Sequence, residues 1–261
     1  MMPRILVIAG SDSSAGAGIQ ADIKTAQALG CYAQTAITAV TAQNTRDVTK
    51  VHPVPADIVA AQIEACLRDI GADAVKIGML GSAKIVRAVA SALPKKIPLV
   101  LDPLMVSTSG HRLLAANAVA AMIRELFPRA SLVTPNIPEA KALAGITRSK
   151  RGDAEAAGRK LIAMGAHAAL IKGGHATRAT VDDVLVWRGG VEVYAYPRVK
   201  TRHTHGTGCT LSTAIACGLA QGLSLPLAVG RAREYLQHAI ATAPGLGKGH
   251  GPLNHGGEIA K

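Results

Sequence analysis

Aromatic residues are scarce in this chain, whose 261 residues include one Trp, four Tyr and one Phe. Many proteins hold single-stranded nucleic acid by stacking bases on aromatic rings, so this scarcity argues against that class of partner. A formal net charge of +12 still favours anionic partners, among them phosphorylated metabolites. Because 49% of the residues are hydrophobic, the core has to consist of aliphatic side chains, which suits a parallel sheet covered by helices.

Cysteine motifs, P-loop motifs and membrane-spanning segments are missing as well. The four cysteines show no CxxC spacing, which argues against structural zinc and secreted disulfide scaffolds and favours the cytoplasm. No GxxxxGKS or GxxxxGKT sequence occurs, which excludes a P-loop nucleotidase. The apolar N-terminal run is too short for a signal peptide. Residues 206–230 carry no charge, but their Gly, Ser, Thr, Gln and Pro content argues against a membrane span, so we expect neither a membrane nor a nucleic acid as partner.

Short runs of Ile, Val and Leu alternate with alanine-rich segments of helical period, which predicts repeated βα units. The expected strands are residues 4–9, 33–38, 47–54, 74–78, 98–102, 131–134, 168–172, 183–187 and 191–196. The expected helices are residues 16–30, 55–70, 82–93, 115–127, 137–145, 152–165, 208–221 and 225–242. Gly189 and Gly190 fit a hairpin turn, which predicts a small antiparallel edge. We therefore expect one α/β domain over residues 1–261, with a three-layer, mostly parallel central sheet flanked by helices and an irregular Gly-rich tail over 244–261.

Chemically rich segments follow the expected strands at their carboxyl ends, where open α/β sheets bind ligands. These segments are GSD (10–12), AQNT (42–45), KIGM (76–79), DP (102–103), TPN (134–136) and KGGH (172–175). The sequence therefore predicts one binding site at this edge of the sheet.

The loop GSDSSAGAGIQAD opens a helix and allows several interpretations. It is either a tight strand-to-helix turn or a loop in which Asp12 or Asp22 contacts a ligand. Asp22 falls within the first turns of the helix, where it could accept a proton or hydrogen bond from a hydroxyl. Gly16 and Gly18 match part of a dinucleotide fingerprint, which leaves an NAD-dependent oxidoreductase open, although the acid expected about twenty residues later is missing.

The stretch HTHGTGCT places two glycines and a cysteine at the start of an expected helix. The first amides of a helix lack internal partners and carry the positive end of its dipole, so they form an anion site. That field would make Cys209 partly thiolate at neutral pH, whereas the alternative is a buried, inert thiol. His203, His205 and Cys209 have metal-binding side chains, but their spacing matches no zinc pattern.

Polar residues at other strand ends also have a structural and a functional interpretation. Asn136 and Glu139 fit a helix cap and equally an oxygen site for hydrated Mg²⁺. Asp102 fits a turn or an anionic group beside metal and phosphate. Lys172 ends an apolar strand, where a buried lysine needs an anion, so a phosphate contact is the preferred role. Gln43 can donate and accept, which suits a ring bearing an amino group beside a ring nitrogen, or it caps a loop.

Taken in order, these motifs resemble the hydroxymethylpyrimidine/phosphomethylpyrimidine kinases of thiamine biosynthesis, within the ribokinase-like superfamily. The resemblance spans residues 5–255 and rests on GSD…GAGIQAD, TAQNT, KIGML, LDP-x-M, TPN-x-x-EA, KGGH, HTHGTGCTLS and GHGPLNH. It implies a cytoplasmic homodimer that transfers phosphate from Mg-ATP to 4-amino-5-hydroxymethyl-2-methylpyrimidine and then to its monophosphate.

The resemblance also assigns roles to individual positions. It implies substrate contacts by Gln43, Asp22, Ala17, Gly10, Met79 and Val106. It implies a catalytic anion hole and reacting centre formed by Gly206, Thr207, Gly208, Cys209 and Lys172. Lys172, Thr207, Asn136 and Asp102 would contact the nucleotide, and Glu139, Asn136 and Asp102 would hold Mg²⁺, mostly through water.

Some positions depart from the family pattern. Ser13 and Ala15 stand where the family usually has Pro and Gly, and Thr108 and His203 replace the usual Lys and Asn. His111 or Arg112 could compensate for the missing lysine. Some relatives with the same cysteine loop phosphorylate vitamin B6 compounds, so pyridoxal kinase is the alternative function, while Gln43 favours the aminopyrimidine.

Overall fold

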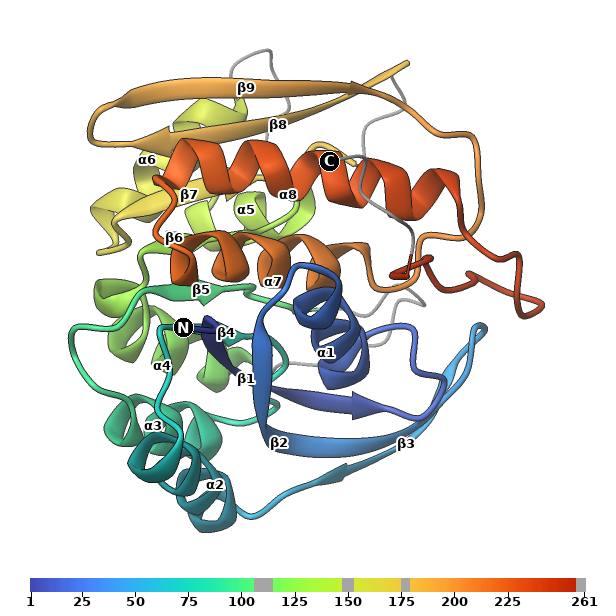
Figure 1. Ribbon diagram of the computed structural model, residues 1–261. Helices are drawn as coiled ribbons and strands as arrows, with labels where there is room; N and C mark the ends of the chain where they lie inside the picture. Colours follow the sequence, from blue (N-terminus) through green and yellow to red (C-terminus); the bar gives the residue numbers. More distant parts are fainter. Residues whose placement is uncertain (106–114, 147–152, 175–178, 257–261) are drawn as a thin grey trace.

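The computed structural model describes residues 1–105, 115–146, 153–174 and 179–256. A nine-stranded sheet in the order β3-β2-β1-β4-β5-β6-β7-β8-β9 forms its centre (Figure 1). The strands are β1 Arg4–Asp12, β2 Tyr32–Gln43, β3 Val48–Pro53, β4 Ala74–Ile77, β5 Leu99–Leu101, β6 Leu132–Val133, β7 Ala168–Ile171, β8 Thr180–Trp187 and β9 Gly190–Pro197. All nine correspond to strands expected from the sequence.

Helices cover both faces of this sheet and give the expected three layers. They are α1 Gly18–Ala28, α2 Ala56–Asp69, α3 Ala83–Ala92, α4 Ala116–Glu125, α5 Ile137–Ala144, α6 Asp153–Ala163, α7 Thr207–Ala220 and α8 Leu225–Ala241, with a 3₁₀ turn at Phe127–Arg129. Helices α1, α7 and α8 bury their apolar residues in one core cluster, and α2 to α6 bury theirs in a second cluster on the other face. The predicted helices are thus confirmed.

Strand direction follows the burial of each strand. Strands β2, β1, β4, β5, β6 and β7 pair in parallel, and Ile5–Ile8 of β1 is a continuous, fully buried apolar run, as a strand covered on both faces requires. Strands β8 and β9 form the expected antiparallel hairpin. Two further antiparallel pairs, β2 with β3 and β7 with β8, were not specified by the sequence.

Backbone hydrogen bonds continue beyond the short central strands and align the segments that follow them. The Asp102 amide donates to Ile77, the Thr134 amide to Leu101, and the Lys172 amide to Pro135. The segments after β4, β5, β6 and β7 are therefore held in register at one edge, as the sequence predicts for the binding site.

The Gly-rich C-terminal segment is irregular, as expected, yet it is packed against the domain. Leu253 and His255 are 4% and 5% exposed, and Tyr235 of α8 donates to the His255 carbonyl. His205 pairs with Pro252 in an isolated bridge. The described part of this segment therefore forms part of the wall behind the start of α7.

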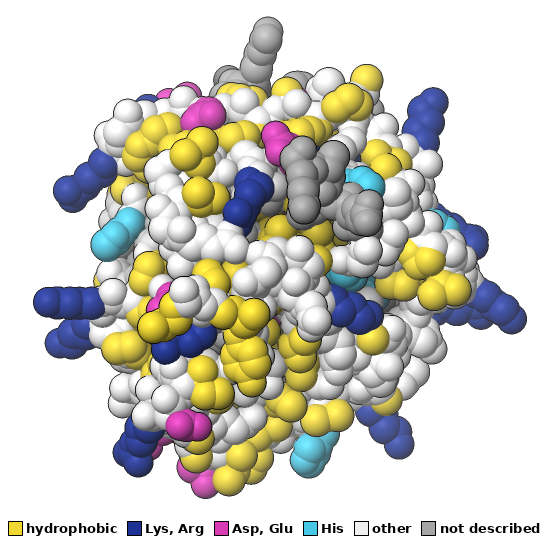
Figure 2. Space-filling view, viewed as in Figure 1, with side chains coloured by type: hydrophobic (Ala, Val, Ile, Leu, Met, Phe, Trp, Pro, Cys, Tyr) yellow, Lys and Arg dark blue, Asp and Glu magenta, His cyan; other side chains and the backbone are white. Residues whose placement is uncertain are grey.

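The spread of basic side chains and the length of the helices concern the nucleic-acid and membrane partners considered above. Figure 2 shows Lys and Arg side chains spread around one face in separate groups. The uncharged stretch 206–230 is divided between α7 and α8. Within the described ranges, every helix is too short or too polar to span a bilayer.

Candidate active site

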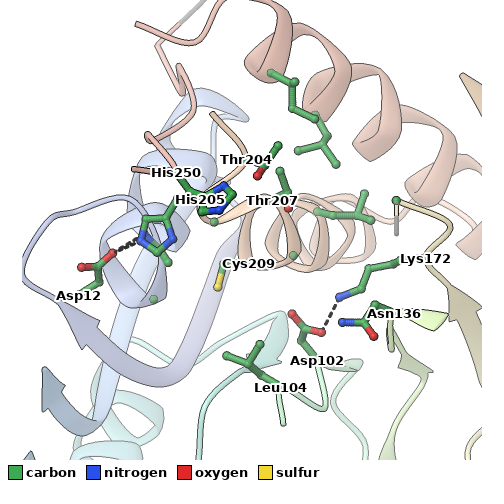
Figure 3. Close-up of a pocket in the computed structure, with 18 of the residues that line it drawn as sticks. Asp12, Asp102, Leu104, Asn136, Lys172, Thr204, His205, Thr207, Cys209 and His250 are labelled. Atoms are coloured by element: carbon green, nitrogen blue, oxygen red, sulfur yellow. Dashed lines mark hydrogen bonds and ion pairs between the residues drawn. The ribbon is translucent and has the colours of Figure 1, made fainter. Parts of the chain in front are cut away.

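A cavity of about 500 Å³ opens at the carboxyl ends of the strands, against the start of α7. Its lining includes the predicted residues Gly10, Ala17, Gln43, Met79, Asp102, Asn136, Glu139, Lys172, Gly206, Thr207, Gly208 and Cys209. Figure 3 shows that two ion pairs, Asp12 with His205 and Asp102 with Lys172, lie on either side of Cys209. The structure thus gathers in one cavity residues that are up to 199 positions apart in the chain.

Glycines shape the loop before α7 so that its first turn borders the cavity. Gly206 caps the helix with φ +85°, and a Cβ there would lie 1.9 Å from the Gly16 carbonyl oxygen. Only glycine permits both this conformation and this close approach. The first-turn amides of Gly208 and Cys209 have no partner inside their own helix, as the predicted anion site requires.

An ion pair lies directly beside this helix start. Lys172 Nζ is 2.8 Å from Asp102 Oδ1, and a Cβ on Gly208 would lie 3.2 Å from both Lys172 Nζ and Asp102 Oδ2. Burial lowers the pKa of Lys172, but the Asp102 and Glu139 carboxylates outweigh burial and raise the pKa overall. A positive charge therefore lies next to the start of α7, and its partner, Asp102, is 1% exposed.

Cys209 is buried, with 8% of the residue exposed. Burial raises the pKa of its thiol to about 11 and outweighs the nearby Lys76 ammonium, which lowers it. The expectation of a partly ionised thiol at neutral pH is therefore wrong, because the desolvation of Cys209 is stronger than the favourable charges around it. At neutral pH, Cys209 therefore presents a neutral thiol to the cavity.

Asp22 does not reach the cavity wall. Its carboxylate is fully buried and accepts hydrogen bonds from Lys76 Nζ, at 2.9 and 2.8 Å, and from Thr213 Oγ1, at 2.6 Å. A buried carboxylate needs a cation, and Lys76 on β4 supplies it, so the Asp22 oxygens are held inside the core and do not line the cavity. The sequence placed Lys76 in the segment KIGM after a strand, whereas it lies within β4 and faces Asp22. A lysine within the apolar run AVKIG is itself a signal for a buried anion.

Asn136 and Glu139 form the predicted capping box. The Asn136 side chain accepts from the Glu139 amide at 2.9 Å, and Glu139 Oε2 accepts from the Asn136 amide at 2.9 Å. Glu139 Oε1 also accepts from the Met105 amide at 3.2 Å. Each Glu139 oxygen thus holds one backbone donor and retains a lone pair, so the cap and a role toward a hydrated cation are compatible.

The described residues contain no group of three His, Cys, Asp or Glu side chains arranged to hold a metal ion by themselves. Hydrated Mg²⁺ needs fewer protein ligands, because it keeps several waters and uses substrate phosphates. Val106 lies outside the described residues, as do Thr108, His111 and Arg112.

Two buried polar pairs at the cavity were not predicted from the sequence. Asp12 and His205 are in contact across 193 positions, with 2.8 Å between Oδ2 and Nε2. Arg233 of α8 pairs with Asp183 of β8 at 3.0 Å, and its guanidinium lies 4.7 Å from the centre of the Tyr196 ring. Both pairs join elements that the sequence alone does not bring together.

Beyond these polar pairs, the cavity continues into an apolar end. Aliphatic and proline side chains from β8, β9, the following loop and α8 line it: Val181, Pro197, Val199, Leu236 and Ile240. The cavity is therefore lined by Gln43 and the Asp12–His205 pair, by the start of α7, and by aliphatic side chains near α8.

Comparison with known proteins identifies the family. A family model described as phosphomethylpyrimidine kinase matches residues 12–254. A hydroxymethylpyrimidine/phosphomethylpyrimidine kinase of Streptomyces coelicolor is 46% identical over 256 residues, covering 97% of this chain and 94% of that protein. A thiamine biosynthesis bifunctional protein of Geobacter sulfurreducens is 46% identical over 253 residues, and the match covers 96% of this chain and about half (52%) of that protein.

Solved structures agree with the fold. Pyridoxal kinase from Staphylococcus aureus, in complex with AMP-PCP and pyridoxal, superposes with a TM-score of 0.90 at 33% identity, covering 98% of this chain and 94% of that one. The expected ribokinase-like architecture is thereby confirmed. Because the family model spans nearly the whole described chain, the chain belongs to the phosphomethylpyrimidine kinase family.

Proposed function

We propose that this protein is an ATP-dependent kinase that phosphorylates 4-amino-5-hydroxymethyl-2-methylpyrimidine and then its monophosphate. The observation that carries the proposal is one cavity with three parts: Gln43 at one end, the start of α7 beside Lys172 in the middle, and an apolar end near α8. These parts suit an aminopyrimidine, the transferred phosphate and an adenine ring, respectively. The names of the relatives support the same substrate class.

The proposed chemistry is an in-line phosphoryl transfer. The hydroxymethyl oxygen forms a bond to the γ-phosphorus, the bond from that phosphorus to the β,γ-bridging oxygen breaks, and ADP leaves. The hydroxyl proton passes to solvent or to the thiolate fraction of Cys209. Negative charge spreads over the oxygens of the transferred group, so positioning and electrostatic stabilisation dominate catalysis. The amides of Gly208 and Cys209 and the Lys172 ammonium would hold this charge.

We also propose that ATP binds with Mg²⁺. Asp102, Asn136 and, through water, Glu139 present the hard oxygen ligands that Mg²⁺ prefers, and Asp102 Oδ2 lies against Gly208 beside the anion site. When bound, the ion neutralises phosphate charge. Lys172 and Thr207 would contact the phosphates, and Gly10, Ala17 and Met79 would line the pyrimidine.

Further parts of the proposal concern the state of the protein. We propose that residues 1–261 act as one kinase domain, because a single sheet includes strands from Arg4 to Pro197. We propose a cytoplasmic homodimer, as the family resemblance implies. Direct contact of Asp22 with the substrate is replaced by an indirect role, because its carboxylate is held by Lys76 and Thr213.

Pyridoxal phosphorylation is the second candidate. It is favoured by the TM-score of 0.90 to a pyridoxal kinase, whereas the higher sequence identity, 46%, is to a hydroxymethylpyrimidine/phosphomethylpyrimidine kinase. The family match replaces the NAD-dependent oxidoreductase that the Gly16 and Gly18 loop also allowed.

ADP release on adding each alcohol tests the proposal. We expect ADP with the aminopyrimidine alcohol, at a higher kcat/KM than with pyridoxal, and mass spectrometry should detect the monophosphate followed by the diphosphate. Gln43→Ala should raise KM for the pyrimidine and leave KM for ATP unchanged. Release of ADP with pyridoxal alone would establish the second candidate instead.

A further inference from the structure

Three side chains at the polar end of the cavity form a continuous chain of contacts. His205 Nε2 lies 2.8 Å from Asp12 Oδ2 and 3.4 Å from Gln43 Nε2. Asp12 and His205 are 3% and 5% exposed, and all three residues line the cavity. Figure 3 shows the His205 ring directed at the Asp12 carboxylate. The protonation of this ring therefore decides what Gln43 can do.

The Asp12 contact fixes a proton on His205 Nε2. Burial raises the pKa of Asp12, but hydrogen bonds from His205 and Ser14 outweigh it and lower the pKa overall, so Asp12 is a carboxylate that only accepts. A ring nitrogen 2.8 Å from such an oxygen carries a proton, whether the imidazole is neutral or charged. His205 Nε2 thus has no lone pair to offer the Gln43 side-chain nitrogen.

Thr41 presents the opposite mismatch at the other end of the same amide. Its Oγ1 lies 2.9 Å from the Ser11 carbonyl oxygen and 3.3 Å from Gln43 Oε1. A hydroxyl has one proton, and the Ser11 carbonyl can only accept, so the shorter contact takes that proton. Toward Gln43, Thr41 Oγ1 offers only lone pairs, which suit a donor.

A half-turn of the Gln43 amide about its Cγ–Cδ bond exchanges oxygen and nitrogen with little change of shape. It gives Thr41 Oγ1 a donor, and at His205 it replaces two facing donors with a carbonyl oxygen beside the N–H that Asp12 holds. We propose that Asp12 and His205 are specificity-determining positioning residues that fix the Gln43 carbonyl oxygen toward His205 and its NH₂ group toward Thr41. The order of donor and acceptor that Gln43 presents to a ligand is therefore set, through His205, by Asp12 at the end of β1.

This order selects a class of ring, an inference that rests on the proposed function. The free lone pair of the Gln43 oxygen reads a ring substituent that donates, on the His205 side. The free N–H of the amide reads a ring nitrogen that accepts, on the Thr41 side. A 4-aminopyrimidine presents this order, while its 4-oxo analogue presents a carbonyl acceptor beside a ring N–H donor, which is the reverse.

Nitrogen-15 NMR of the histidine rings in the protein without ligands tests the first step independently of activity. We expect His205, assigned by its absence in His205→Ala, to carry a proton on Nε2. An unprotonated Nε2 would overturn the inference, because the Gln43 nitrogen could then donate to His205.

Kinetics with the 4-amino and 4-oxo pyrimidine alcohols test the second step. We expect the ratio of kcat/KM, amino over oxo, to fall at least tenfold in His205→Ala, because Gln43 is then free to turn. A merely structural role for His205 would lower both values together, so an unchanged ratio would overturn the inference. The matched control is His52→Ala on the exposed face of β3, which should keep the wild-type ratio. Failure of the wild type to phosphorylate either alcohol would instead refute the proposed function, while the NMR result stands.

Discussion

Cys209 holds its proton at neutral pH because burial of the thiol outweighs the positive charge of Lys76. If Cys209 accepts the hydroxyl proton, it does so as the small thiolate fraction. With a pKa of about 11, this fraction grows about tenfold per pH unit below that value. We therefore predict that kcat rises with pH between about 7 and 9 in the wild type, since raising the pH ionises a thiol.

Replacement of Cys209 by Ala should abolish this pH dependence and lower kcat by about 10²–10⁴-fold near pH 9, the range of general-base catalysis. Stopped-flow or coupled ADP assays across that range provide the measurement. Cys66, which is half-buried on α2, offers the matched control, since Cys66→Ala should retain the rise with pH. A loss of less than tenfold in Cys209→Ala would leave the thiol with a role in shaping the cavity only.

Ala15 has a backbone conformation that suits glycine. Its φ of +60° makes it the one non-glycine residue in the left-handed region among those the structure describes, and glycine is what the family resemblance implies there. That conformation costs an L-residue about 1–2 kcal/mol. Glycine avoids this cost but destabilises the folded state by about 0.5–1 kcal/mol, because its unfolded chain has more conformational freedom to lose. Ala15→Gly should therefore stabilise the protein by about 0.5–1 kcal/mol, or about 1–4 °C in Tm.

Differential scanning fluorimetry without ligands is sufficient to measure this shift. Ala88→Gly within helix α3 is the matched control and should have the opposite sign, because glycine in a helix costs about 1 kcal/mol relative to alanine. A lower Tm for Ala15→Gly would contradict the prediction, because it would mean that the backbone conformation of Ala15 costs less than the added entropy of glycine in the unfolded chain.

Residue identity predicted the cavity lining well where a local rule applied. Gly206 follows from helix-start chemistry, and Lys172 from the cost of a buried lysine. The His205 contact with Asp12 could not be predicted, because the end of β1 and the segment before α7, 193 positions apart, meet only after the sheet forms. The prediction that Cys209 is partly ionised was wrong for the same reason, because burial depends on tertiary packing, which a local motif does not contain.

At the scale of elements, Asp22, Lys76 and Thr213 join α1, β4 and α7 in one buried polar cluster. Thr213 lies one turn after Cys209 on α7, so the cluster holds the face of the helix that carries Cys209. We predict that Lys76→Met lowers the free energy of unfolding by about 3–5 kcal/mol, because it leaves a buried carboxylate without its cation. Urea denaturation monitored by circular dichroism measures this loss.

The double variant Lys76→Met with Asp22→Asn should recover at least half of that loss. An amide at position 22 carries no charge and can still accept from Thr213. If the double variant is no more stable than Lys76→Met, the destabilisation arises from the packing of methionine, and the ion pair contributes little.

The elements themselves were predictable from hydrophobic period, and their pairing was not. Strand β1 contains the unbroken aliphatic run Ile5–Ile8, and α3 carries its buried Ile85, Val86 and Val89 on one side, so both patterns are local. The antiparallel placement of β3 beside β2 depends on how a four-residue connection, 44–47, folds back. The direction of such a pair is a property of the assembled sheet.

At the scale of the whole molecule, the C-terminal segment connects α8 to the start of α7 through His255. Its Nε2 lies 2.9 Å from Thr210 Oγ1 in the first turns of α7, and the residue is 5% exposed. Burial, with a smaller contribution from Lys24, lowers the pKa of His255 to about 4. The folded protein therefore keeps this ring neutral at pH values where an unfolded chain would protonate it.

This difference makes the whole fold acid-sensitive. Between the unfolded pKa of about 6.5 and the folded pKa of about 4, the unfolded chain binds more protons, so stability falls as the pH falls. The full shift corresponds to about 3 kcal/mol. We predict that the free energy of unfolding declines across this window, and that His255→Gln, which does not titrate, removes most of the decline. His52→Gln, at an exposed position, should leave the decline intact; an equal slope in wild type and His255→Gln would assign acid sensitivity to other groups.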